Sequence, residues 1–190
     1  MSTLQVNTIS ESTSGSGVTV DGVLIKDGKL ASGTGNILQV IGITDNTDTS
    51  YNVSSATQLG SLSIAITPSA TSSKILLIAS LNLGTYDERY WHVGFFRGST
   101  ALGLSDQGTG SQTNAAFSPN VGEWTHSRFH TMVTHIHHLD SPSTTSATTY
   151  SIKVSRYSSS TIYYNRPEYS ADAGYYIASQ SNFTVMEVGG

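Results

Sequence analysis

The chain alternates short apolar runs with polar turns, and this pattern predicts β-strands throughout. Leu62, Ile64 and Ile66 alternate with small polar or neutral residues, which is the period of a strand with one buried face. Further β-branched or aromatic runs occupy residues 37–43, 74–83, 90–97, 128–139, 150–154, 163–164, 175–177 and 183–188. No run of helical length repeats apolar residues at helical spacing. The sequence therefore predicts an all-β fold.

The number and spacing of these strands favour an antiparallel sandwich, with a jelly roll as the expected form. Residues 76–78 are apolar at consecutive positions, as in a central strand covered on both faces. Residues 102–123 are rich in Gly, Ser, Asn and Gln and contain no clear strand. A loop of this length is either a partner-facing surface or a passive connector.

Residues 1–35 differ from the sandwich expected over residues 36–190. Two tight-turn signals, Asp21-Gly22 and Asp27-Gly28, separate short apolar pairs in this part. Such a segment cannot bury a core alone, so we expect an extended N-terminal arm that docks on other chains; the alternative is a disordered leader. Its expected docking residues are the apolar ones: Leu4, Val6, Ile9, Val18, Val20, Val23 and Ile25.

Charge is sparse in this sequence. Only 12% of residues are charged, the net charge is −4 and nine Lys and Arg residues are scattered, so we expect no nucleic-acid binding. Few charges suit copies that pack side by side, although a secreted β domain is equally compatible. The absence of cysteine favours a reducing cytoplasm. The start has no signal-peptide pattern, and the longest apolar stretch, residues 75–83, is too short for membrane insertion.

Residues 62–77 (LSIAITPSATSSKILL), 164–166 (YNR) and 182–188 (NFTVMEV) carry a family resemblance. The first segment looks like the first core hairpin of fibre-type structural proteins of marine and cyanobacterial tailed phages, and the other two resemble the end of the same domain. The opening residues 4–9 (LQVNTI) and residues 17–28 resemble their virion-attachment arms. Residues 86–146 are not covered by the resemblance.

The resemblance implies a trimeric jelly roll, similar to the C1q and tumour-necrosis-factor sandwiches, located in the virion. It implies a tail fibre or spike that contacts the host envelope, with residues 1–35 bound to other virion proteins. The rival expectation is a head fibre or capsid decoration protein with a purely architectural role. A weaker third one is a bacterial lectin-like module unrelated to virions.

Catalytic motifs are missing from the sequence, so we expect no enzyme and no cofactor. There is no nucleophile elbow, phosphate loop or His-Glu-x-x-His pattern. A glycan-cleaving spike would need two facing carboxylates, and Glu123 with Asp140 is a pair that sequence does not exclude.

Aromatic residues are the expected receptor-binding groups. Tyr supplies a large contact area, a polar tip and few rotamers to freeze, which suits the recognition of a host surface glycan. The alternative is that these rings fill the core and the seam between subunits. The expected contact residues are Trp124, Tyr163, Tyr164, Tyr169, Tyr175 and Tyr176.

Five of the six histidines lie between His126 and His138. On a strand, His135 and His137 point to the same face, with Val133 and Leu139 beside them. Three chains around an axis would offer six such imidazoles to a divalent transition metal. The alternative is a hydrated strand whose imidazoles bond to hydroxyls and water.

Overall fold

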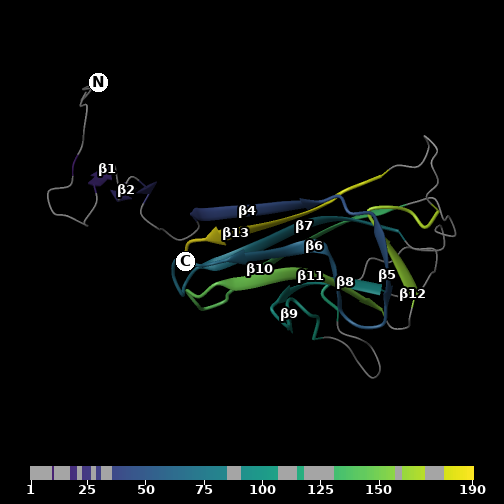
Figure 1. Cartoon of the computed structure of the whole chain (residues 1–190). Coiled ribbons are helices and arrows are strands. Elements are labelled where there is room, and N and C mark those ends of the chain that lie inside the picture. Colours follow the sequence, from purple (N-terminus) through teal and green to yellow (C-terminus); the bar gives the residue numbers. More distant parts are fainter. Residues whose placement is uncertain are drawn as a thin grey trace.

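The computed structural model describes residues 10, 18–20, 23–26, 29–30, 36–84, 91–106, 115–117, 131–156, 160–169 and 178–190. Every regular element in these residues is a strand (Figure 1), and none of them forms a helix with the length and apolarity needed to cross a membrane. The strands are β1 (Val18–Val20), β2 (Val23–Lys26), β3 (Lys29–Leu30), β4 (Ile37–Asp45), β5 (Thr49–Val53), β6 (Thr57–Ile66), β7 (Lys74–Gly84), β8 (Trp91–Arg97), β9 (Thr100–Ala101), β10 (Met132–Asp140), β11 (Thr148–Arg156), β12 (Ser160–Tyr164) and β13 (Ser181–Val188).

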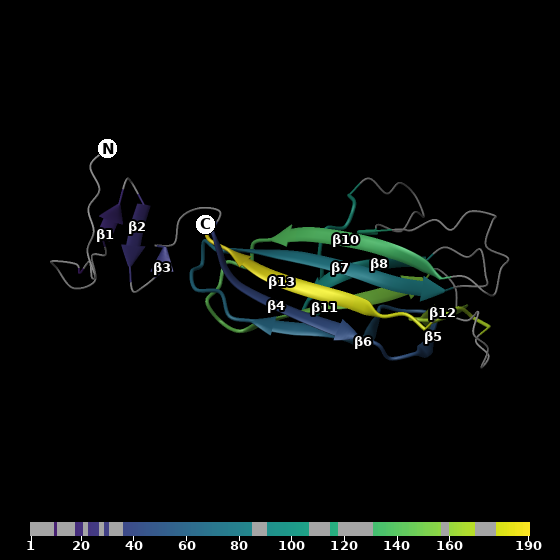
Figure 2. The ribbon, with the colours of Figure 1, turned by 90° about the horizontal axis from the view of Figure 1, so that it is seen from above.

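Two antiparallel layers form a sandwich. The first layer holds β4, β13, β7 and β10 side by side, and β12 and β5 extend it past the end of β13 (Figure 2). The second layer has the order β6-β11-β8-β9. The first strand of the sandwich, β4, pairs with the last, β13, and most connections cross between layers. This winding is a jelly roll, so the predicted fold class is confirmed.

The arm contributes a small sheet of its own. Strand β2 pairs with β1 and β3, and no described strand of the sandwich pairs with any of the three. The sandwich strands begin at Ile37. The domain boundary after residue 35 stays a prediction.

The core lies between the layers and is built by strict alternation. On β7, the side chains of Ile75, Leu77, Ala79, Leu81 and Leu83 are buried, which places every second residue of the strand in the core. Aromatic and aliphatic groups of both layers complete this core, among them the stacked rings of Phe95 on β8 and Phe183 on β13, whose centroids are 5.7 Å apart.

Two short strands were not expected from the sequence. Strand β5 (TSYNV) is mostly polar, and it forms because β12 supplies a partner along its whole length. Strand β9 has two residues that pair with the end of β8. Both owe their conformation to a neighbouring strand rather than to a hydrophobic period of their own. The expected strand at residues 175–177 lies outside the described residues.

Asn165 forms a buried hub at the end of the sandwich where β4 finishes. Its side-chain Nδ2 donates to the backbone oxygens of Asp45 (2.9 Å) and Thr47 (3.0 Å), and its Oδ1 accepts from Ser181 Oγ (2.7 Å). Its backbone has a φ of 60°, a conformation that Asn tolerates better than most residues. The hub therefore joins β4, β12 and β13, and it explains the role of the YNR segment as scaffold.

Glu187 connects the last strand to the turn between β6 and β7. Its carboxylate is fully buried and accepts hydrogen bonds from Ser69 N (2.7 Å), Ser69 Oγ (2.6 Å) and Gln39 Nε2. Two of the segments that carry the phage resemblance, residues 62–77 and 182–188, thus meet at this carboxylate. Burial alone would raise the pKa of Glu187, but these hydrogen bonds outweigh it and hold the pKa below its usual range.

Acid should destabilise the fold through Glu187 and Asp45. Asp45 is buried too; burial would raise its pKa, but hydrogen bonds from Thr47 and Ser61 lower it. A pKa lower in the folded than in the unfolded chain adds stability that is present above the unfolded value, near pH 4, and is lost as pH falls through the folded value. Melting temperatures measured from pH 7 to pH 2.5 should be level at first and fall below about pH 4.

The variant Glu187→Gln distinguishes the contribution of Glu187 to acid destabilisation from the contribution of all other titrating groups. The amide cannot accept all the hydrogen bonds of the carboxylate, so the variant should be less stable at pH 7. Its stability curve should converge on that of the unsubstituted protein at low pH, where Glu187 is protonated. Parallel curves across the whole range would contradict a titrating role for Glu187.

Candidate self-association face

The outer face of the first layer carries most of the exposed apolar side chains of the described chain. In the described part of the chain, seven large hydrophobic side chains are exposed, and five of them belong to this face: Ile37, Val40, Ile78, Val133 and Leu139. They come from β4, β7 and β10. Contiguous exposed apolar surface on a soluble domain marks an interaction site far more often than scattered single residues do.

Strand register aligns these side chains into rows across the layer. Val40 on β4 lies opposite Met186 on β13, Met186 opposite Leu76 on β7, and Leu76 opposite Leu139 on β10. This gives one apolar row of four strands. The next two rows, read in the same order, are Gly42, Thr184, Ile78 and His137, and then Thr44, Asn182, Ser80 and His135. We call the surface formed by Ile37, Val40, Leu76, Ile78, Val133, Leu139, Met186 and Val188 the apolar face.

Charge is almost absent from these rows. The acidic residues of the same strands, Asp45, Asp140 and Glu187, are buried on the opposite side, and Lys74 stands at the end of β7, opposite Val188. A surface with so few Lys, Arg, Asp and Glu side chains can meet a copy of itself with little like-charge repulsion and little desolvation of ions. The face is therefore suited to self-association.

One part of this face, residues 76–78, is recognisable in the sequence, but the pattern there predicts a covered strand rather than an exposed one. Consecutive apolar residues at positions 76–78 predicted a strand covered on both sides. Strand β7 is indeed central, with neighbours on both edges, but Ile78 remains 41% exposed on its outer side. The second apolar side of the strand faces outward and is not covered by another element of the described chain.

His135 and His137 lie on the apolar face, as the alternation predicts. Both are exposed on β10, while Thr134 and Ile136 between them are buried. Their neighbours across the pairing are Ser80 and Ile78. Within one chain, the described residues hold no group of three metal-ligating side chains. A metal site shared between copies therefore stays a prediction.

The expected receptor residues are dispersed. Tyr164 is fully buried, with its ring edge-on to Tyr51 at 6.2 Å, so it is a core residue and its predicted surface contact is wrong. Tyr163 is half-buried beneath the Arg166 guanidinium at 5.2 Å, and Tyr169 is exposed. Trp124, Tyr175 and Tyr176 lie outside the described residues.

The loop expected at residues 102–123 is anchored where it is described. Leu102 is buried and donates its N–H to Phe95 O (2.9 Å), and Phe117 O accepts from Val93 N (3.0 Å). Leu102 and Phe117 thus both lie along β8. Residues 107–114 and 118–123 lie outside the described part. So do the arm residues Leu4, Val6 and Ile9, and the side chains of Val18, Val20, Val23 and Ile25.

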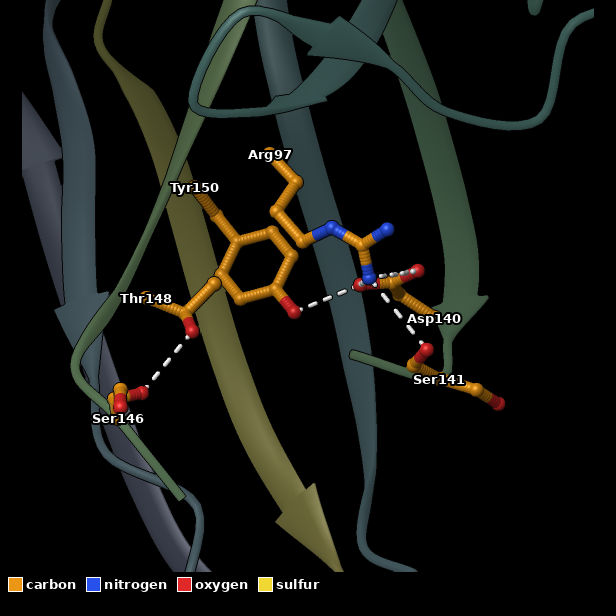
Figure 3. A network of polar contacts seen from close by, with 6 residues as sticks. All are labelled: Arg97, Asp140, Ser141, Ser146, Thr148 and Tyr150. Carbon is orange, nitrogen blue, oxygen red and sulfur yellow. Dashed lines mark hydrogen bonds and ion pairs between the residues drawn. The ribbon is translucent and has the colours of Figure 1, made fainter. Parts of the chain in front are cut away.

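Asp140, considered above as a catalytic carboxylate, is held in a structural clasp (Figure 3). It accepts a hydrogen bond from Tyr150 Oη (2.7 Å) and forms an ion pair with Arg97 (3.0 Å). Burial and the Asp140 carboxylate both raise the pKa of Tyr150. Because Asp140 ends a strand of one layer and its two partners belong to the other, the clasp joins the layers. Its suggested partner Glu123 is outside the described residues.

No protein-family model matches the chain, and no curated protein matches it either.

Proposed function

We propose that the protein is a non-enzymatic structural protein of a bacteriophage particle, a trimeric tail fibre or spike that contacts the host envelope. Residues 1–35 dock it on other virion proteins, and the sandwich projects from the particle. The phage assignment is supported by the resemblance of residues 4–9, 17–28, 62–77, 164–166 and 182–188. The assembly is supported by the apolar face, which is the observation that carries the proposal.

Trimer formation buries the apolar face against the equivalent faces of two other copies. At about 25 cal/mol per Å² of apolar surface removed from water, side chains such as Val40, Ile78 and Leu139 favour assembly strongly. A cyclic arrangement closes without leaving an open apolar edge. Three copies also multiply a weak contact per site into useful avidity for a host surface glycan.

The two ends of the sandwich differ in a way that suits this orientation. The arm enters at the end where Asn36 O accepts from Gly189 N (2.7 Å). At the opposite end, beyond Asp45, lie the Tyr163–Arg166 pair and the Arg166–Asp48 ion pair (2.9 Å). An aromatic ring beside a guanidinium suits sugar stacking and hydrogen bonding. In the proposal this end faces the host.

The proposal is tested by mass and by removal of the arm. Light scattering of the full chain at micromolar concentration should give three times the chain mass of 20.2 kDa. Residues 36–190 alone should remain a folded trimer, because the apolar face belongs to the sandwich, but should no longer be incorporated into phage particles. Antibody labelling of purified particles measures incorporation.

Each result tests a different part of the proposal. A monomer mass contradicts self-association, and an unfolded truncated chain contradicts the boundary after residue 35. Suppose that labelling finds the protein on normal particles, but particles without the protein adsorb to host cells equally well. That result favours the architectural rival, a head fibre or decoration protein.

A further inference from the structure

A small cup lies on the outer side of the second layer, away from the apolar face. It has a volume of about 180 Å³ and is bounded by β8 and β11. In the register of these strands, His92 lies opposite Ser155 and Gly94 opposite Lys153. Leu104 and Ala116 also line the cup.

The cup exists because small residues line its floor. Gly94 has no side chain, and a Cβ added there would lie 3.2 Å from the Cβ of Ala116. Ala56 and Ala101 are also among its lining residues. The larger groups, Phe96 and Leu104, stand around these small ones and leave an open space between them.

A cation is held over this space, and no described residue forms an ion pair with it. The Lys153 ammonium lies 4.6 Å from the centroid of the Phe96 ring, a cation–π contact that positions the charge but does not neutralise it. None of the described residues that line the cup is acidic. The cup thus presents net positive charge to an incoming ligand.

Neutral hydrogen-bonding groups lie near the ammonium. Ser155 Oγ and His92 Nε2 are within hydrogen-bonding distance of each other, and burial lowers the pKa of His92, which favours the neutral imidazole. A hydroxyl and a neutral imidazole can each donate to and accept from ligand hydroxyl groups. Apolar walls, a few convergent polar groups and one charge are typical of a small-molecule site.

We propose that this cup binds one carboxylate-bearing sugar residue, such as a uronic acid. Lys153 pairs with the carboxylate, Ser155 and His92 bond to ring hydroxyls, and Phe96 and Leu104 pack against the C–H face of the sugar. The cavity is smaller than the roughly 300–1,000 Å³ of drug-sized sites, so it fits a single ring rather than an oligosaccharide. All of these groups come from one chain, so the site does not depend on the proposed assembly.

The test compares two sugars that differ at one carbon. Galacturonate carries a carboxylate where galactose carries a hydroxymethyl group. Titrated into the ¹⁵N-labelled full chain at low salt, galacturonate should shift the amide signals of Gly94, Lys153 and Ser155, with an affinity at least about tenfold above that of galactose. Lys153→Gln should remove this preference by lowering the affinity for galacturonate to about that for galactose.

A second lysine provides the matched control. Lys74 is exposed at the end of β7 on the other layer, so Lys74→Gln removes the same charge and should leave the preference for galacturonate intact. Equal binding of the two sugars, absence of shifts at the cup, or an equal loss in the Lys74→Gln and Lys153→Gln variants would overturn the proposal. Circular dichroism confirms that each variant is folded.

Discussion

If the proposed trimer forms through the apolar face, Leu139→Glu should convert it into folded monomers. Leu139 is 48% exposed in the single chain and ends the apolar row formed with Leu76, Met186 and Val40. Assembly would bury three new carboxylates against apolar side chains, and each unpaired ion costs several kcal/mol to desolvate. A cost on the order of 3 kcal/mol per chain weakens association by more than a hundredfold. Light scattering and sedimentation at micromolar concentration measure the change in mass.

Leu104→Glu is the matched control for this substitution. Leu104 is the same residue type with nearly the same exposure, 49%, but it belongs to the cup on the other layer. Its replacement should leave the trimer mass unchanged, while the new carboxylate should repel galacturonate from the cup. If both glutamate variants are trimeric, the apolar face is not the interface. If both variants are monomeric, a new charge disrupts assembly wherever it is placed, and the result does not identify the apolar face as the interface.

Much of the sandwich was predictable because its core strands alternate. A buried side on β6 or β7 requires an apolar residue at every second position, and Leu62, Ile64 and Ile66 display that period directly. The jelly-roll form was expected from the number and spacing of the strands and from the resemblance, but neither specified the individual strand pairings. It depends on which strands pair across long connections, such as β4 with β13, and no local period encodes that choice.

Side-chain environment was harder to predict than strand position. Tyr163 and Tyr164 are adjacent tyrosines, and only the strand register decides that one ring is half-buried and the other fully buried. Strand β5 has no apolar period, since it is stabilised by pairing with β12. His135 and His137 were placed on one face correctly because that inference needs only the two-residue repeat.

The cup could not have been found from sequence. Its parts, Ala56, Gly94, Ala116 and Lys153, are scattered along the chain and meet only when β8 and β11 pair and residues 115–117 lie against β8. A glycine within an aromatic strand was the one local sign that something approaches closely. The apolar face could be predicted in part. Consecutive apolar residues show that both sides of β7 are apolar, but they do not show what covers the second side.

Replacing Asn165 is expected to cause the largest loss of stability of any single change discussed above. Its side chain makes three hydrogen bonds in a fully buried position. Removing it leaves two backbone oxygens without the Nδ2 donor and the Ser181 hydroxyl without its acceptor, while Ser181 Oγ still accepts from Asn82 N. Each buried polar group left unsatisfied costs about 1–3 kcal/mol. Asn165→Gly, which keeps the backbone conformation, should therefore lower the free energy of unfolding by about 3–5 kcal/mol, a large share of a typical total of about 5–15 kcal/mol.

Asn165→Ala should cost about 1–2 kcal/mol more than Asn165→Gly, because a Cβ is disfavoured at a φ of 60°. Ser143 is the control for losing a polar side chain at positive φ without burial: it has a φ of 53° but is exposed in the connection between β10 and β11, so Ser143→Ala should change stability by less than about 1 kcal/mol. Urea denaturation of the four proteins, with the unsubstituted chain as reference, measures these differences. A loss below about 1 kcal/mol for Asn165→Gly would mean that water replaces the hub, and β4, β12 and β13 would then be held together by strand pairing and core packing alone.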